Sequence, residues 1–240
     1  IAEKIANALS DFGNYNNVLE IGPGKGILTK FLLLNKNFNT YVVEIDNDSV
    51  DYLISESVID ENKIINHDFL KLDVKTMFPE PIAIIGNFPY NISSQIVFKI
   101  LENRNQIPEV VGMFQKEVAK RIVSPPGSKE YGILSVLTQA WYNAEYLFTV
   151  NEGVFFPPPK VKSGVIRLQR NNKQTLNCNE QKFIQIVKAG FNQRRKTLRN
   201  ALSSFNLQET NNFNTIQHLM TLRAEQLSVD DFVMIAKVLD

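Results

Sequence analysis

The sequence is poor in the residues that bind metals and form disulfides. Its 240 residues include one cysteine, Cys178, and two histidines, His67 and His218, which lie far apart. A single cysteine excludes an internal disulfide, and no Cys or His stands at the spacing of a metal site. We therefore expect a cytoplasmic protein without a bound metal.

Long apolar runs are also missing. The longest aliphatic runs, "FLLL" at 31–34 and "IAII" at 82–85, are far shorter than the roughly 20 residues that a membrane span needs. The opening "IAEKIANALSDF" is unlike a secretion signal, because charged and polar residues interrupt it. We expect no membrane association. Because the chain opens on Ile1 rather than Met, we also expect further residues upstream.

Net charge is nearly absent, but the charge is unevenly distributed. The sequence has 26 basic and 25 acidic residues, a net charge of +1. The segment 182–199 contains no acidic residue and carries six basic ones: Lys182, Lys188, Arg194, Arg195, Lys196 and Arg199. Such a segment is either a solvated helix face or a binding surface for a polyanion.

What is present is an alternation of short β-rich runs with helical patterns up to about residue 170, which is typical of a layered α/β fold. We predict seven strands, at 17–22, 40–46, 63–68, 82–87, 110–115, 144–150 and 164–170. After residue 179 only helical patterns remain. The sequence thus predicts a Rossmann-like α/β domain over residues 1–172 and a small helical domain over residues 173–240.

A glycine loop, "EIGPGKG", follows the first predicted strand. Gly22, Gly24 and Gly26 let the turn approach a ligand closely. A dinucleotide site has the spacing G-x-G-x-x-G, and here the third glycine comes one residue early, which argues against NAD. Glu20, two residues before the loop, favours a positively charged ligand without a diphosphate. S-adenosylmethionine fits this description.

The next two strand ends carry acidic residues. Glu44 stands about 20 residues beyond the loop, where a carboxylate can accept both ribose hydroxyls, and its neighbour Ile45 belongs to the same predicted cofactor site. Asp46 is better suited to cap the following helix. Asp68 ends the third strand and is placed for an adenine amino group, while Phe69 offers a ring contact and a backbone N–H.

The fourth strand ends in "GNFPYNIS", at the same edge of the sheet. This segment can be interpreted as an ordinary turn. It can also be interpreted as a catalytic loop, in which the Asn87 side-chain oxygen and a backbone carbonyl near Phe88 or Pro89 accept both hydrogens of an adenine amine. The lone pair of the amine nitrogen would then face a methyl sulfonium. Pro89 fixes the backbone and Tyr90 stacks on a purine that has left its helix or loop. Asn87 also adjoins the cofactor.

Together these motifs resemble the KsgA-type ribosomal RNA adenine dimethyltransferases. The resemblance extends over nearly the whole chain and rests on "EIGPGKG", "VVEID", "HDFL", "GNFPYNIS", "FQKEVAKRI", "PPGSKEYGILSV", "FFPPPKVKSGVIRL" and "NQRRKTLRNAL". It implies S-adenosylmethionine-dependent dimethylation of N6 of two adjacent adenines near the 3′ end of 16S rRNA in immature small subunits. It also implies that Phe155 is a second stacking aromatic. In the family a "Q-x-F-L" segment just before the helix that matches the first helix here closes over the methionine end of the cofactor, and the sequence begins after that position.

An RNA substrate changes the interpretation of the basic residues. We expect Arg194, Arg195, Lys196 and Arg199 to open a helix of the small domain and contact phosphates. Lys116 and Arg121 are predicted to flank the catalytic slot. We expect a monomer.

Two alternatives stay open. Erm-type dimethyltransferases, which modify one adenine of large-subunit rRNA, share the glycine loop and "N-[LF]-P-[YF]". A ribosome assembly factor that only binds RNA is the other, although the intact set of Asn87, Pro89 and Tyr90 argues against it.

Overall fold

The computed structural model describes residues 1–155 and 157–240 and divides into two compact units. The first comprises Ile1–Ala119 and Asn143–Arg170, and the second comprises Lys120–Tyr142 and Asn171–Asp240. The predicted boundary at residue 172 lies close to the end of the first unit. Residues Lys120–Tyr142, which the sequence assigned to the first domain, group with the C-terminal helices instead, because the helix they contain packs on those helices.

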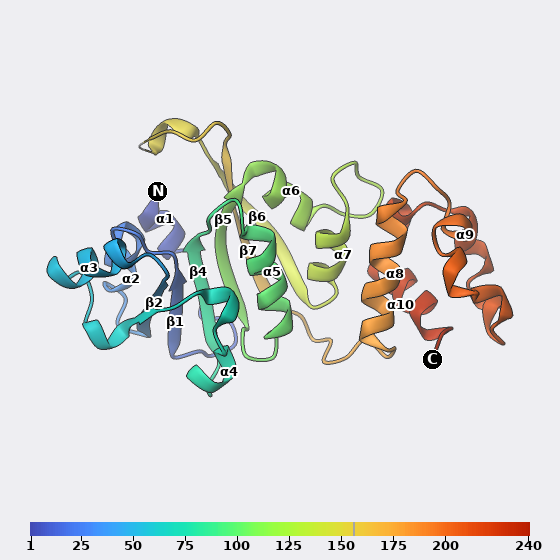
Figure 1. The fold of residues 1–240 in the computed structure, drawn as a ribbon, viewed down its shortest axis with the longest axis horizontal. Coiled ribbons are helices and arrows are strands. Elements are labelled where there is room, and N and C mark those ends of the chain that lie inside the picture. The colour runs from blue at the N-terminus through green and yellow to red at the C-terminus, as the bar shows by residue number, and fades with distance from the viewer. Residues whose placement is uncertain (156) are drawn as a thin grey trace. The chain divides into compact units, whose positions relative to one another are not determined.

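A seven-stranded sheet forms the centre of the first unit (Figure 1). Its strands are β1 (Asn17–Ile21), β2 (Asn39–Glu44), β3 (Ile64–Asn66), β4 (Ile82–Asn87), β5 (Glu109–Gln115), β6 (Tyr142–Val150) and β7 (Ser163–Arg170). Their order is β3-β2-β1-β4-β5-β7-β6, with β1 to β5 parallel and β7 antiparallel to β5. All seven predicted strands are present, and the predicted fold class is confirmed.

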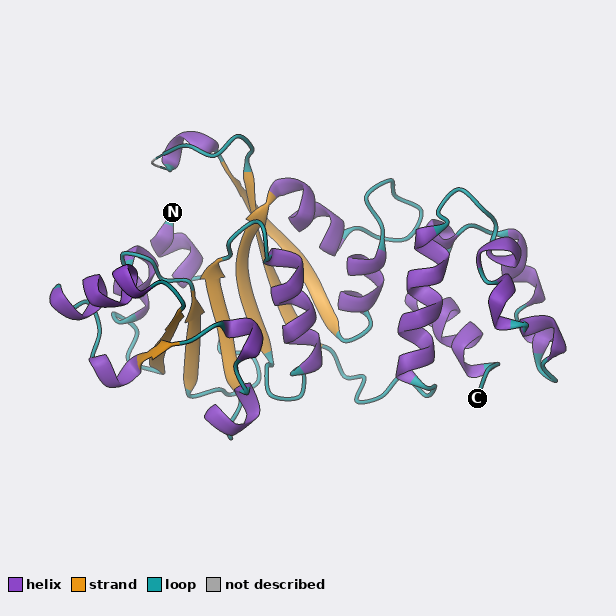
Figure 2. Ribbon diagram, in the orientation of Figure 1, coloured by secondary structure: helices purple, strands orange, loops and turns teal. Residues whose placement is uncertain are grey.

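Helices cover both faces of this sheet, as Figure 2 shows. The β4 run "IAIIG" is buried throughout, as expected of a parallel strand that is covered on both sides. Ala83 and Ile85 pack with α1 (Ala2–Ala6) and α2 (Ile27–Leu32), while α5 (Ser93–Glu102) lies on the other face (Figure 1). The remaining helices of the unit are α3 (Asn47–Ser55), α4 (Val74–Met77), η1 (Glu61–Lys63), η2 (Phe69–Lys71) and η3 (Glu152–Val154).

The strand order reverses between β1 and β4. From β1 the chain continues to β2 on one side, whereas from β4 it continues to β5 on the other. In open α/β sheets, ligands bind beyond the carboxyl ends of the strands at such a reversal. The candidate site is therefore expected where β1 and β4 end.

The second unit is helical. It contains α7 (Ile133–Gln139), α8 (Glu180–Asn192), α9 (Leu198–Ala201), α10 (Val229–Lys237) and the short helices η4 (Ser203–Phe205), η5 (Leu207–Glu209), η6 (Phe213–Thr215), η7 (Gln217–Thr221) and η8 (Ala224–Gln226). Helix α6 (Lys116–Val123) spans the boundary between the units. Trp141 meets Phe183 edge-on at 6.0 Å between ring centroids, within an apolar core. None of the helices in the described part of the chain combines the length and apolar character that a bilayer span requires.

The predicted helix cap at Asp46 is confirmed, whereas a predicted helix start is not. Asp46 caps α3 by accepting the Ser49 N–H at 3.0 Å, and Ser228 pairs with Asp231 at the start of α10. The prediction that the basic residues open a helix is wrong for Arg194, Arg195 and Lys196, because α8 ends at Asn192 and residues 193–196 form a turn. Arg199 does lie in α9, which begins at Leu198. Because residues 192–197, "NQRRKT", include no apolar side chain, a helix there would have no face to bury.

Candidate active site

A cavity of about 290 Å³ joins the glycine loop to the end of β4. Five predicted site residues line it: Glu20, Gly22, Gly24, Asn87 and Phe155. The other lining residues are Ile1, Ala2, Ile5, Pro23, Lys25, Ile27, Leu28, Met113 and Val154. The Asn87 amide therefore lies at the same cavity as the glycine turn, rather than in packed interior.

The glycine loop takes a backbone path that other residues adopt only with strain. Gly22, Gly24 and Gly26 have φ of 67°, 53° and 70°. A Cβ at Gly26 would come within 2.5 Å of Val58, whereas a Cβ at Gly24 would meet nothing within 4 Å. Gly26 thus closes the loop against the core, and Gly24 leaves open space on the cavity side.

Glu20 is an acid buried beside this loop. Only 2% of it is exposed, and its carboxylate accepts the Thr29 hydroxyl at 2.6 Å. The pKa of Glu20 is raised to about 8, because burial and, to a smaller extent, the negative charge of Glu44 outweigh the lowering effect of the Thr29 hydrogen bond. A carboxyl held in this way favours a cation at the cavity.

Glu44 connects the end of β2 to the glycine loop. One oxygen accepts the Gly24 N–H at 3.2 Å, and the other accepts the N–H groups of Ile45 and Asp46 at 2.9 and 3.0 Å. The bond to Gly24 is the longest of the three and is the one that a ligand hydroxyl can replace most easily. The Ile45 side chain is 65% exposed, so it offers an apolar contact beside the carboxylate.

The third strand end contributes less than the sequence predicts. Asp68 accepts the Leu70 N–H at 2.9 Å, and neither it nor Phe69 lines the cavity. The Phe69 ring is 4% exposed, so the ring contact and the backbone N–H contact predicted for this residue both stay predictions. The sequence pattern could not distinguish a ring that packs inward from one that faces a ligand.

The backbone after β4 is fixed by packing and a hydrogen bond, whereas the side chain of Asn87, the last residue of β4, is exposed. Asn87 is exposed, and its side chain forms no hydrogen bond with the described residues. Phe88 is 1% exposed: its ring packs where Gly86 and Gly112 have no side chains and meets Phe114 edge-on at 5.0 Å. The Phe88 N–H donates to the Met113 carbonyl at 3.1 Å, which fixes the backbone next to Asn87.

The two candidate backbone acceptors in this loop differ. The Pro89 carbonyl already accepts the Ile92 N–H at 3.2 Å, whereas no backbone N–H of the described residues is bonded to the Phe88 carbonyl. The Pro89 ring lies 3.9 Å from the Cβ position of Gly22, so the β4 loop and the glycine loop are in contact. The Phe88 carbonyl is therefore the free acceptor of the two.

The two predicted stacking aromatics have different surroundings. Phe155, from the loop after η3, is half-buried and lines the cavity with Val154. Tyr90 is half-buried but is not among the cavity-lining residues, and its hydroxyl lies 2.6 Å from Ser163 Oγ.

The predicted RNA-contacting residues fall into both units. Lys116 begins α6 in the first unit, whereas Arg121 and the basic cluster belong to the second. Arg121, Arg195, Lys196 and Arg199 are exposed. Arg194 is not free: its guanidinium bonds to Glu225 at 2.7 Å and to the Lys129 carbonyl at 2.6 Å. Arg194 thus joins parts of the second unit.

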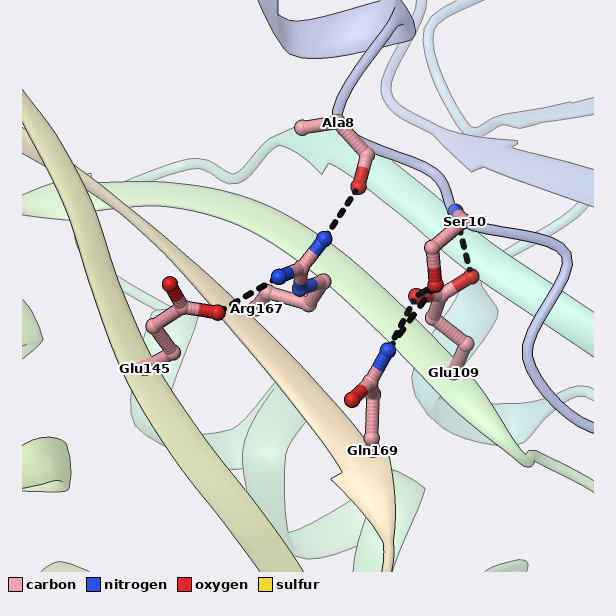
Figure 3. Close-up of polar contacts among 6 residues, drawn as sticks. All are labelled: Ala8, Ser10, Glu109, Glu145, Arg167 and Gln169. Atoms are coloured by element: carbon pink, nitrogen blue, oxygen red, sulfur yellow. Dashed lines mark hydrogen bonds and ion pairs between the residues drawn. The ribbon is translucent and has the colours of Figure 1, made fainter.

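Helix α1 contributes Ala2 and Ile5 to the cavity and is tied to the sheet by polar contacts at its C-terminal side. Figure 3 shows Arg167 of β7 donating to the Ala8 carbonyl, and Ser10 bonded to the buried Glu109 of β5. Ser10 donates to Glu109 through both its N–H and its hydroxyl, at 3.0 and 2.6 Å. We call Ser10, Glu109 and Arg167 the α1 anchor.

Sequence reasoning missed several cavity residues. Met113 pairs with Asn87 across β4 and β5, and the rule that neighbouring parallel strands end at one edge could have found it. Helix α1 gave no such signal, because its apolar residues read only as core. No group of acidic, His and Cys residues in the described part of the chain is arranged to hold a metal ion.

The residues at the cavity fit S-adenosylmethionine. The open side of Gly24 leaves space for an extended ligand, the Glu20 carboxyl suits its positive charge, and the exposed side chains of Ile27 and Ile45 offer apolar contacts. The cavity volume is near the lower end of the roughly 300–1,000 Å³ usual for small-molecule sites.

Comparison with known proteins identifies the relatives of this chain. The sequence matches the family described as ribosomal RNA adenine dimethylase over residues 1–240. Two proteins named ribosomal RNA small subunit methyltransferase A are similar to it. That of Cytophaga hutchinsonii is 55% identical over 239 residues, covering 100% of this chain and 92% of the relative. That of Flavobacterium johnsoniae is 54% identical over 241 residues, covering 100% of this chain and 90% of the relative.

Solved structures show the same fold. A dimethyladenosine transferase from Plasmodium falciparum has a TM-score of 0.77 at 25% identity, with 98% of this chain and 93% of that chain covered. The 23S rRNA methyltransferase ErmE has a TM-score of 0.68 at 24% identity, with 98% and 96% covered. The family match over residues 1–240 and the relatives that are more than half identical lead to one conclusion. The chain belongs to the ribosomal RNA adenine dimethylase family.

Proposed function

We propose that this protein is an S-adenosylmethionine-dependent dimethyltransferase of small-subunit rRNA, acting on N6 of two adjacent adenines near the 3′ end of 16S rRNA. The observation that carries the proposal is that Asn87 and the glycine turn line one cavity. The names of the relatives that are 55% and 54% identical support the choice of substrate.

S-adenosylmethionine, when bound, supplies an activated methyl group. The residues proposed to hold it are Glu20 for its positive charge, the glycine loop, Glu44 for the ribose hydroxyls, with Ile45 beside them, and Asp68 and the Phe69 N–H for the adenine. Of these, Glu20 and the glycine loop stand at the cavity itself. Glu44 is linked to the loop through Gly24, so a ribose that replaces this bond leaves the carboxylate with its other two donors.

The target adenine leaves its stack and places its amine at Asn87. The Asn87 side-chain oxygen and the Phe88 carbonyl accept the two hydrogens, which directs the nitrogen lone pair away from both acceptors. Phe155 and Tyr90 stack on the purine ring. The rigid backbone at Pro89 keeps the Phe88 carbonyl in place. Preorganised acceptors of this kind cost no reorganisation at the moment of reaction.

The helical unit is proposed as the RNA-binding domain. Arg195, Lys196 and Arg199 are exposed and can neutralise phosphates, with Arg121 and Lys116 as further contacts. Phosphate contacts position without specifying sequence, so the adenine pair is found through the shape of the immature small subunit. The protein acts as a monomer in the cytoplasm, where subunits are assembled.

The test is mass spectrometry of rRNA after incubation of immature small subunits and large subunits with the full-length protein and methyl-labelled cofactor. The proposal expects two methyl groups on each of two adjacent adenines of 16S rRNA. Label in large-subunit rRNA alone would support an Erm-type activity instead. ErmE has the same fold as this chain, so the fold does not distinguish the two activities. Binding to small subunits without label would support a non-catalytic assembly factor.

A further inference from the structure

The backbone that follows Asn87 is fixed by contacts on both sides of Pro89. Phe88 is buried in the core, and the Tyr90 carbonyl accepts the Ser93 hydroxyl at 3.1 Å at the start of α5. These contacts hold the backbone on both sides of Pro89. They do not fix the direction of the Tyr90 side chain, because it can still turn about its Cα–Cβ bond.

The contact that does restrict the ring is made by its hydroxyl. Tyr90 Oη and Ser163 Oγ lie 2.6 Å apart, a short hydrogen bond between two hydroxyl groups. Ser163 is 0% exposed, although Tyr90 is only half-buried. A buried hydroxyl needs a partner, and Tyr90 is the hydrogen-bond partner of Ser163 in the described structure.

Ser163 itself stands on a rigid element. It is the first residue of β7 and pairs with Gln115 of β5, and the preceding carbonyl, of Lys162, accepts the Lys116 N–H at 2.9 Å. A polar group on a strand is positioned more accurately than one on a loop.

We infer that Ser163 is a positioning residue for methyl transfer, whose hydroxyl holds the tip of the Tyr90 side chain and so fixes the position of the ring against which the target adenine stacks. This rests on the proposed function. Neither hydroxyl touches the reacting atoms in this arrangement. Its effect is to hold the purine, and with it the amine, at the Asn87 acceptors, where a small misplacement is costly to the rate.

The test is a double-mutant cycle with Ser163→Ala and Tyr90→Phe, measured as methyl transfer to immature small subunits. Each single variant is expected to lower kcat by about three- to tenfold, the effect of one hydrogen bond, with the cofactor dissociation constant unchanged. Because both changes remove the same bond, the double variant should be no slower than the slower single variant. Multiplying effects would overturn the inference, and so would wild-type rates.

A matched control distinguishes loss of the positioning contact from loss of any tyrosine hydroxyl hydrogen bond. Tyr146 Oη and Thr149 Oγ1 form a similar pair, at 2.8 Å, on β6. Tyr146→Phe should leave kcat within twofold of wild type, and an equal loss in this control would contradict the assigned role. The Asn87→Ala variant separates the inference from the proposed function. If wild type transfers methyl groups and Asn87→Ala does not, the function stands whatever the cycle shows.

Discussion

The Thr29 hydroxyl donates a 2.6 Å hydrogen bond to the Glu20 carboxylate, beside the cavity that the glycine loop lines. This bond favours the ionised carboxylate, but burial outweighs it, and the pKa of Glu20 is raised to about 8. The charged groups that face this region are Glu44 from β2 and Lys25 in the loop. Near pH 7 the ligand-free protein therefore holds Glu20 mostly protonated.

A cation at the cavity should reverse this state. Binding of S-adenosylmethionine lowers the pKa of Glu20, so we expect a proton to be released from Glu20 on binding near pH 7 and affinity to rise from about pH 6 to about pH 9. Calorimetry in buffers of different ionisation enthalpy measures the release. Glu20→Gln is the control, because it keeps the shape, lacks the proton and cancels titration of the ligand's own groups. Equal proton release from wild type and Glu20→Gln would remove Glu20 from this linkage.

The same carboxyl should make stability depend on pH. Its folded-state pKa, about 8, is above the ordinary value of 4.5, so its contribution to stability is full below pH 4.5 and is lost as pH rises toward 8. In this window the free energy of unfolding of wild type should fall relative to that of Glu20→Gln, by at most about 1.4 kcal/mol per pH unit. Urea denaturation of the ligand-free proteins at several pH values measures the difference. A constant difference across the window would show that Glu20 titrates normally.

Asn87 is the residue whose loss should affect turnover most. Asn87→Ala removes one of the two proposed amine acceptors, and we expect kcat to fall by about a hundredfold while RNA affinity stays within twofold. Asn91→Ala, an exposed amide in the same loop, is the matched control and should keep wild-type turnover. Single-turnover methyl transfer and filter binding separate the two quantities. Normal turnover of Asn87→Ala would refute the assigned role.

The sequence was most informative at the strand ends. Parallel strands that are buried on both faces read as continuous apolar runs, so β4 was recognised, and the shared carboxyl edge brought Asn87 and Gly22 to one cavity as expected. Residue type could not show which way a side chain faces. The Phe69 ring was therefore assigned to a ligand although it packs inside.

Contacts between segments that are distant in the chain could not be predicted from the sequence. Nothing near Arg194 indicates that Glu225 will pair with it, so it was grouped with its exposed basic neighbours. Ser163 likewise gave no signal, because its partner Tyr90 lies 73 positions away in the chain. Both cases depend on how the elements pack rather than on local pattern.

The turn at residues 193–196 should therefore contain basic residues of two kinds, one that contacts RNA and one that stabilises the fold. Arg195→Ala is expected to weaken RNA binding and to reduce the slope of log affinity against log salt by about 1, without changing stability. Arg194→Ala should instead lower the melting temperature, and Glu225→Ala should lower it similarly because the same ion pair is lost. Salt-dependent binding and thermal melts test the distinction. If Arg194→Ala changed only the salt slope, the pair with Glu225 would not be structural.

The α1 anchor gives a last prediction, on how a distant contact affects the cavity. Glu109 is fully buried and accepts hydrogen bonds from Ser10 and Gln169, as Figure 3 shows, and also from the Tyr15 hydroxyl. Glu109→Ala leaves the buried Tyr15 hydroxyl without this partner, so we expect it to lower the free energy of unfolding by about 1–3 kcal/mol.

Because α1 lines the cavity through Ala2 and Ile5, loosening it should also weaken cofactor binding by several-fold while RNA affinity is kept. Glu145→Ala is the control: Glu145 pairs with Arg167, the α1-anchor residue that bonds the Ala8 carbonyl, but the Glu145 side chain is 57% exposed, and an exposed ion pair contributes about 0–1 kcal/mol. Calorimetry and urea denaturation measure both effects. A Glu109→Ala protein that loses stability but binds S-adenosylmethionine as tightly as wild type would show that α1 holds its place at the cavity without the anchor.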